Sequence, residues 1–214
     1  MLGLPKTTEI AKQLSKKAIF SKFELKPAQR DHFDADISRI DIVNMVSPNT
    51  VPGLQEGERV KEFYVLLVSL KQEDYDEKNI LLLSKLIKQH MVFALAYQDR
   101  VRLAVVHEKL FATDWEPLAN AVLPLMGFDM DKVWENLVMA IGHFEVMEGV
   151  TIEEQITIDG ERQKVIKQIE TLEKKARLEK QPRRKLELFE RLKEIRKQID
   201  LYNFKDNSNN HDNI

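Results

Sequence analysis

The 214-residue sequence contains no cysteine and only seven glycines. Without cysteine, the chain cannot form a disulfide, a thiolate nucleophile or a cysteine-ligated zinc site. The phosphate-binding patterns GxxxxGK(S/T) and GxGxxG are absent, and so are the HExxH and GxSxG patterns of zinc proteases and serine hydrolases. We therefore expect no cofactor, and no motif marks a catalytic centre.

Histidine, the other common metal ligand, is scattered along the chain. A zinc site needs several ligands close together, and the sequence offers only one suggestive pair, His107 and Glu108. This pair follows a predicted strand, where a structural or solvent-facing role is expected. No metal site is predicted.

Long hydrophobic runs are also missing. No apolar run approaches the roughly 18 to 20 residues of a membrane-spanning helix, and the N-terminal stretch MLGLPKTTEIAKQLSKK lacks the apolar centre of a signal peptide. We therefore expect a cytoplasmic protein with no membrane association. With 43% hydrophobic residues, the chain is rich enough in apolar side chains to bury a core.

The net charge of −2 averages over a strong division along the chain. Residues 161–200 contain fourteen Lys or Arg and eight Asp or Glu, which gives this segment a net charge of +6. The remainder must then carry −8. An acidic body followed by a basic appendage is the predicted organisation.

Residues 1–150 show both helical and extended hydrophobic patterns. Helices are predicted over at least the second half of 7–23, and over 27–33, 77–90 and 130–144. Strands are predicted over 36–46 and 62–71 and in a hairpin over 91–108. Because these strands are adjacent rather than strictly alternating with helices, we predict an α+β domain with a mixed or antiparallel sheet and packed helices. Trp134 is predicted to lie in the core, whereas Trp115 is left open to base stacking.

Two hydrophobic seams follow, each with apolar residues spaced by four and three positions. They consist of Val165, Ile169, Leu172 and Ala176, and of Leu188, Leu192, Ile195 and Ile199. Pro182 lies between them, and a proline inside a helix costs about 3 kcal/mol. Residues 151–202 are therefore predicted to form an antiparallel coiled-coil hairpin. The alternative is one long helix kinked at Pro182, and the polar tail 203–214 is predicted to be disordered.

The segment KKARLEKQPRRK, from Lys174 to Lys185, lies at the predicted reversal of the chain. Its seven basic residues are Lys174, Lys175, Arg177, Lys180, Arg183, Arg184 and Lys185. Two interpretations are open. A charge run at a turn is often simply solvated, but positive charge concentrated on one projecting element also suits contact with phosphates. We take these seven as candidate nucleic-acid-binding residues.

Several longer stretches together resemble the bacterial domain-of-unknown-function family 4391. They are the LPK start, EFYVLLVSLK, IKQH before MVFAL, WEPL, GFDMDKVWENLVMAI and IETLEKKARLEKQPRRKLELFERLKEIRKQI. The resemblance covers nearly the whole chain. It implies genes for helicases and DNA methyltransferases of restriction or phage-defence type nearby, and it brings no catalytic residues.

These features favour a non-enzymatic accessory protein of a bacterial DNA-processing complex. Its expected partner is a helicase or DNA methyltransferase, with self-association through the coiled coil as another option. The alternative is a metal-dependent nuclease of restriction-endonuclease type, with Asp41 and Lys71 as weak catalytic candidates. That pattern needs a carboxylate two residues before the lysine, but Ser69 stands there and Glu73 lies beyond it. Such a nuclease would therefore be degenerate.

Overall fold

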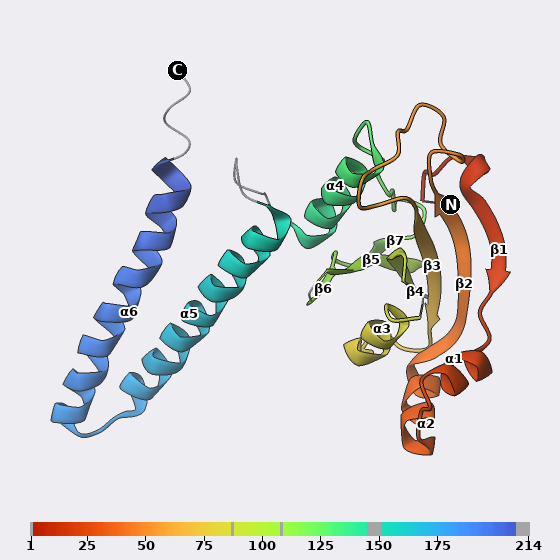
Figure 1. The fold of residues 1–214 in the computed structure, drawn as a ribbon. Helices are drawn as coiled ribbons and strands as arrows, with labels where there is room; N and C mark the ends of the chain where they lie inside the picture. The colour runs from red at the N-terminus through yellow and green to blue at the C-terminus, as the bar shows by residue number, and fades with distance from the viewer. Residues whose placement is uncertain (1, 87, 108, 145–150, 209–214) are drawn as a thin grey trace. The chain divides into compact units, whose positions relative to one another are not determined.

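A seven-stranded sheet organises the first part of the chain in this computed structural model (Figure 1). The structure describes residues 2–86, 88–107, 109–144 and 151–208. The chain divides into two units, residues 1–144 and residues 145–214, and each is described by itself. The first unit has the expected α+β character, because it joins helices to the sheet. The second unit is a pair of helices.

The strands follow one another across the sheet in chain order from β1 to β6, and β7 also pairs with β5. They are β1 (Glu9–Gln13), β2 (Ile37–Val46), β3 (Phe63–Leu70), β4 (His90–Tyr97), β5 (Arg100–His107), β6 (Lys109–Ala112) and β7 (Glu116–Pro117). Among the described strands, only β3 and β4 pair in parallel. A parallel pair needs a crossover connection, and α3 (Glu77–Leu83) lies in it. The sheet is therefore mixed and mostly antiparallel, as predicted.

Helices cover both faces of this sheet. Successive residues of a strand point to opposite faces, and Leu66 of β3 belongs to one cluster with Ile19 of α1 (Lys16–Lys22) and Phe33 of α2 (Pro27–Asp36). Phe63 of β3 instead contacts Trp134 of α4 (Met130–Gly142), with ring centroids 5.7 Å apart. Trp134 is only 4% exposed, which confirms its predicted place in the core.

The structure refines the local predictions. Helix α1 confirms the helix expected over the second half of 7–23, and residues 9–13 before it form strand β1 because they pair with β2. Helix α3 ends at Leu83 rather than His90, because the chain must turn to bring β4 alongside β3. No strand was predicted beyond the hairpin, but the chain there contributes β6 and β7, both paired with β5.

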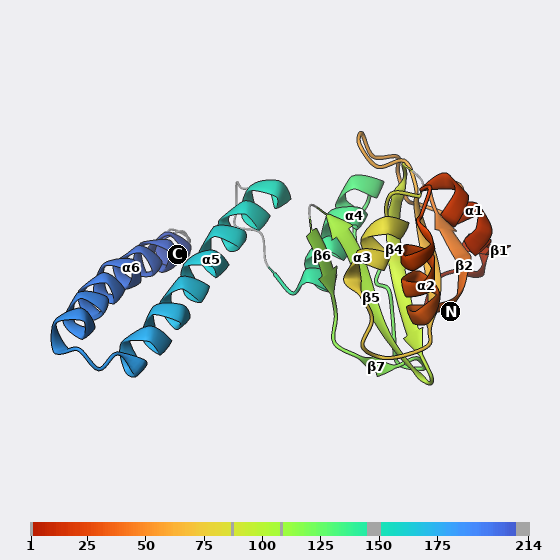
Figure 2. The same ribbon diagram turned by 90° about the horizontal axis from the view of Figure 1, so that it is seen from below.

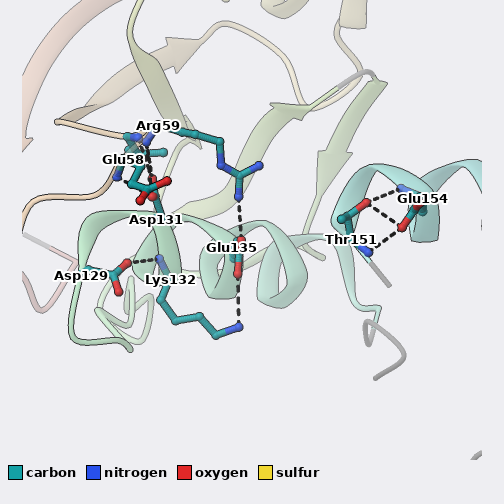
Figure 3. A network of polar contacts seen from close by, with 9 residues as sticks. Glu58, Arg59, Asp129, Asp131, Lys132, Glu135, Thr151 and Glu154 are labelled. Atoms are coloured by element: carbon teal, nitrogen blue, oxygen red, sulfur yellow. Dashed lines mark hydrogen bonds and ion pairs between the residues drawn. The ribbon is translucent and has the colours of Figure 1, made fainter. Parts of the chain in front are cut away.

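The loop between β2 and β3 is fastened to the start of α4 (Figure 3). The carboxylate of Asp131 accepts hydrogen bonds from the backbone N–H groups of Glu58, Arg59 and Val60, with shortest distances of 2.6, 3.1 and 2.7 Å. Arg59 also forms an ion pair with Glu135 at 3.0 Å. We call these contacts the Asp131 anchor. Although burial alone would raise the pKa of Asp131, the three N–H donors lower it below its usual value.

The second unit consists of α5 (Ile152–Leu178) and α6 (Pro182–Ser208) (Figures 1 and 2). Thr151 and Glu154 form a capping box at the start of α5 (Figure 3). Two separate helices, rather than one kinked helix, are present, because α6 begins at Pro182, a favoured first helical residue. Helix α6 continues to Ser208, so it covers the first half of the predicted disordered tail, and residues 209–214 lie outside the described residues.

The apolar seams of α5 and α6 are at least partly covered from solvent. Ala176 and Leu192 are buried, and the other seam residues up to Ile195 are half-buried. Arg196 of α6 forms an ion pair with Glu173 of α5 at 2.5 Å, which ties the helices together beside the seam. Within the part of the chain that the structure describes, no helix has both the length and the apolar character needed to cross a membrane.

Candidate nucleic-acid interface

The seven predicted basic residues come together at the connection between α5 and α6, which we call the basic bend (residues 174–185). Lys174, Lys175 and Arg177 lie in the last turns of α5, and Lys180 lies in the connection. The remaining three, Arg183, Arg184 and Lys185, follow Pro182 in the first turn of α6. The sequence placed the change of direction near Pro182. In the structure α5 ends at Leu178 and α6 begins at Pro182.

The side chains of the basic bend extend into solvent. Six of the seven residues are exposed, and Lys185 is half-buried. Arg177 lies 3.9 Å from Glu173, and Arg183 lies 3.7 Å from Glu187. Among the described residues, no acidic side chain forms an ion pair with the other five. Most of the positive charge at the bend therefore has no ion-pair partner in the part of the chain that the structure describes.

Helix dipoles make the two sides of the bend different. Lysine and arginine near the C-terminus of a helix interact favourably with its dipole, so the cations that end α5 also stabilise it. Cations at a helix N-terminus interact unfavourably with the dipole, and the first turn of α6 carries three of them and no acidic residue. Arg184 and Lys185 therefore do not stabilise α6 electrostatically, which favours a role for them outside the helix, whereas Arg183 also forms an ion pair with Glu187 of the same helix.

Apolar side chains accompany the basic ones. Leu178, Leu186 and Phe189 are exposed, and Phe189 also lines a groove of about 460 Å³ between α5 and α6. Glu173, Arg177, Phe189, Leu192, Lys193, Arg196 and Lys197 line this groove. The second unit thus presents a basic surface with an apolar component, which sequence reasoning described only by its charge.

The nuclease candidates lie in different surroundings. Asp41 is opposite Leu67 in the β2–β3 register, and its carboxylate accepts two hydrogen bonds from Arg39, at 2.6 and 2.8 Å. Lys71 follows the end of β3, four residues beyond Leu67 and therefore about 13 Å along the strand. Its ammonium group donates to the backbone oxygen of Asp34. The structure thus does not bring the two side chains together, and the described residues include no cluster of three or more His, Asp or Glu side chains suited to a metal ion.

Family comparison agrees with the expected resemblance. The model of the family described as Domain of unknown function (DUF4391) matches residues 2–199, which is nearly the whole chain. The chain belongs to this family. No curated protein and no solved structure matches it. Membership in DUF4391 therefore supplies a family but no reaction.

Sequence reasoning on this DUF4391 chain missed a second polar site, in the first unit. His90 begins β4 and His107 ends β5, and the two lie close enough that His107 acts electrostatically on His90. His90 also lies against Trp134, with ring centroids 4.6 Å apart. The predicted hairpin did not fix this proximity, because its register depends on a turn at Gln98 and Asp99 that the structure reveals. Trp115, by contrast, lies beside two guanidinium groups, 5.9 Å from that of Arg100 and 5.7 Å from that of Arg102.

Proposed function

We propose that this chain is a non-enzymatic accessory protein of a bacterial DNA-processing complex, and that its basic bend contacts the phosphate backbone of nucleic acid. One observation carries the proposal: at the bend, seven basic side chains lie within twelve residues, and most have no acidic partner among the described residues. Arg184 and Lys185 in particular form no ion pair with a described residue and lie at the end of α6 where its dipole disfavours cations. Such cations suit phosphates, because binding releases the counterions condensed on the nucleic acid.

The proposed partner within such a complex is a helicase or a DNA methyltransferase. The exposed Leu178, Leu186 and Phe189 support a protein contact, because apolar side chains at the centre of an interface supply much of its binding energy. They lie on the same element as the cations. The pair of helices α5 and α6 would then connect a partner to the nucleic acid.

Salt dependence of binding tests the phosphate contact. If the bend makes about 4 to 6 contacts, the logarithm of the binding constant should fall with the logarithm of salt concentration with a slope of about −4 to −5 on duplex DNA. The measurement is fluorescence anisotropy of a labelled duplex of about 20 base pairs with the full chain, between about 50 and 200 mM NaCl. Replacing Arg183, Arg184 and Lys185 by glutamine should make the slope shallower by about 2 to 3. Replacing all seven basic residues should abolish it.

A matched triple variant separates the bend from general surface charge. Lys12, Lys164 and Lys167 are exposed lysines away from the bend, and their replacement by glutamine removes the same net charge. This control should leave the slope within about one unit of the unmodified chain. Equal changes in both triple variants, or no binding at the lowest salt concentration, would show that the bend is only a solvated turn.

A further inference from the structure

A small polar pocket lies in the first unit, where the hairpin of β4 and β5 meets α4. It has a volume of about 120 Å³, which equals the liquid volume of roughly four water molecules. Its lining consists of Ser84, Lys88, Gln89, His90, Met91, Val106 and Trp134. These residues come from the turn after α3, from both strands and from α4, so the pocket depends on the assembled fold.

Hydrogen-bond donors without acceptors surround this pocket. Trp134 is only 4% exposed, and its buried indole Nε1–H has no hydrogen-bond partner among the described residues. Leaving a buried donor unsatisfied costs about 1 to 3 kcal/mol. The side chains of His90, which is half-buried, and of Lys88 and Gln89, which are exposed, also donate no hydrogen bond to a described residue. The buried indole N–H is the donor that calls for an acceptor, and Lys88 and His90 belong to the same lining.

The charges around the pocket have the sign that an anion requires. Lys88 is the one charged residue in the lining, and no acidic residue is among the lining residues. Asp131 acts on His90 electrostatically, but its carboxylate already accepts the N–H groups of the Asp131 anchor. Burial lowers the pKa of His90, and the nearby His107 and Arg59 lower it further, against the opposing effect of Asp131. Proton uptake by His90 is therefore costly until a negative charge arrives to pair with it.

We infer that this pocket binds one small oxyanion of phosphate size, with Trp134 Nε1–H, the imidazolium of His90 and the ammonium of Lys88 as its donors. Charged oxygens satisfy all three donors at once, whereas a metal cation would meet no carboxylate ligand and an apolar ligand would leave the donors unpaired. The volume admits a phosphate group but not a nucleoside. The site is separate from the basic bend, so failure of the DNA-binding test would leave this inference untouched.

The direct test follows the indole N–H signal of Trp134 in ¹H–¹⁵N NMR spectra of the full chain during titration with inorganic phosphate. We expect a saturable shift of this signal and much smaller changes at Trp115. Replacing Trp134 by phenylalanine keeps an aromatic ring but removes the donor, and should weaken phosphate binding at least about tenfold. Trp115→Phe is the matched control and should bind phosphate like the unmodified chain.

Proton linkage supplies a second readout. Because the bound anion favours the imidazolium form, phosphate should raise the pKa of His90, and binding should strengthen as the pH falls from about 7.5 to 6. His90→Gln should remove this pH dependence, apart from the part due to the titration of phosphate itself, which sulfate as a probe avoids. A dinucleotide with and without a 5′-phosphate distinguishes free phosphate from a phosphorylated strand end as the source of the anion. A Trp134 signal that phosphate, sulfate and the 5′-phosphorylated dinucleotide all leave unmoved would overturn the inference.

Discussion

The carboxylate of Asp131 holds the loop between β2 and β3 through three backbone N–H groups. The loop packs so closely against Asp131 that the identity of Gly57 is also constrained. A Cβ atom placed on Gly57 would lie 2.5 Å from Oδ1 of Asp131 and 2.7 Å from its backbone nitrogen. Only glycine therefore fits at position 57, because a larger residue would collide with Asp131.

Substitution of Gly57 by alanine should destabilise the protein by about 1 to 3 kcal/mol, because the added methyl group must displace Asp131 from its N–H donors. Urea unfolding followed by tryptophan fluorescence measures the change. Gly160 provides the control with the opposite sign. It lies inside α5, and a methyl group added there would meet no other atom within 4 Å, so Gly160→Ala should stabilise that helix by roughly 0.5 to 1 kcal/mol. A neutral Gly57→Ala variant would contradict the packing described for the anchor.

The anchor also predicts a dependence of stability on pH. The pKa of Asp131 is lower in the folded chain than in the unfolded chain. Its contribution is therefore fully present above the ordinary value of 3.8 and is lost as the pH falls through the folded pKa. Asp131→Asn should lower the free energy of unfolding by about 1 kcal/mol at neutral pH, and the difference should vanish in acid. Asp114, which is exposed, supplies the control variant Asp114→Asn, whose unfolding curve should match the unmodified chain at each pH.

Residues whose partners are close in sequence could be predicted, and those with distant partners could not. Asp129 precedes the helix predicted over 130–144, a position typical of an N-cap residue, and it accepts the N–H of Lys132 at 2.8 Å. Asp131, two residues later, looks equally suited to a helix start, but its partners lie 71 to 73 residues away. No local pattern distinguishes these two aspartates, because the groups that the loop donates to Asp131 are backbone N–H groups.

Among the elements, long hydrophobic patterns were the best guides. Strand β3 and the hairpin of β4 and β5 were predicted closely, since their apolar runs are bounded by polar turns. The short β1 has the pattern Glu-Ile-Ala-Lys-Gln, with a single large apolar residue. Residues 9–13 are extended because they pair with β2, although their own sequence shows no strand pattern. Tertiary contact therefore overrides local propensity in β1.

The pairing of α5 with α6 yields a prediction at this scale. Leu192 is 4% exposed in the seam, whereas Phe189, three residues earlier, is 51% exposed. Leu192→Ala should loosen the helix pair by about 2 kcal/mol, at the low end of values for buried leucines because the seam is narrow. Phe189→Ala should change the stability by less than about 0.5 kcal/mol. Amide hydrogen exchange over residues 153–197 measures both effects, and equal acceleration in the two variants would show that the seam does not hold the helices together.

Over the whole molecule, the division of charge was visible in the sequence, but the arrangement of the sheet was not. A count of basic and acidic residues is enough to locate a net charge of +6 in residues 161–200. Strand order depends instead on which edges meet, and a parallel pair of β3 and β4 inside an otherwise antiparallel sheet leaves no periodic signal. The pocket beside Trp134 could not be predicted either, because it forms only where α4 meets the hairpin of β4 and β5.

The Asp131 anchor also sets an order of events during synthesis. The loop that contains Val60 leaves the ribosome 71 residues ahead of the carboxylate that holds it, and at about 5 to 20 residues per second this interval lasts roughly 4 to 14 s. During that time β2 and β3 can already pair, while the loop between them has nothing to bind. The first unit therefore reaches its final form only after α4 has been made, so a nascent chain that stalls before α4 leaves the loop unfastened.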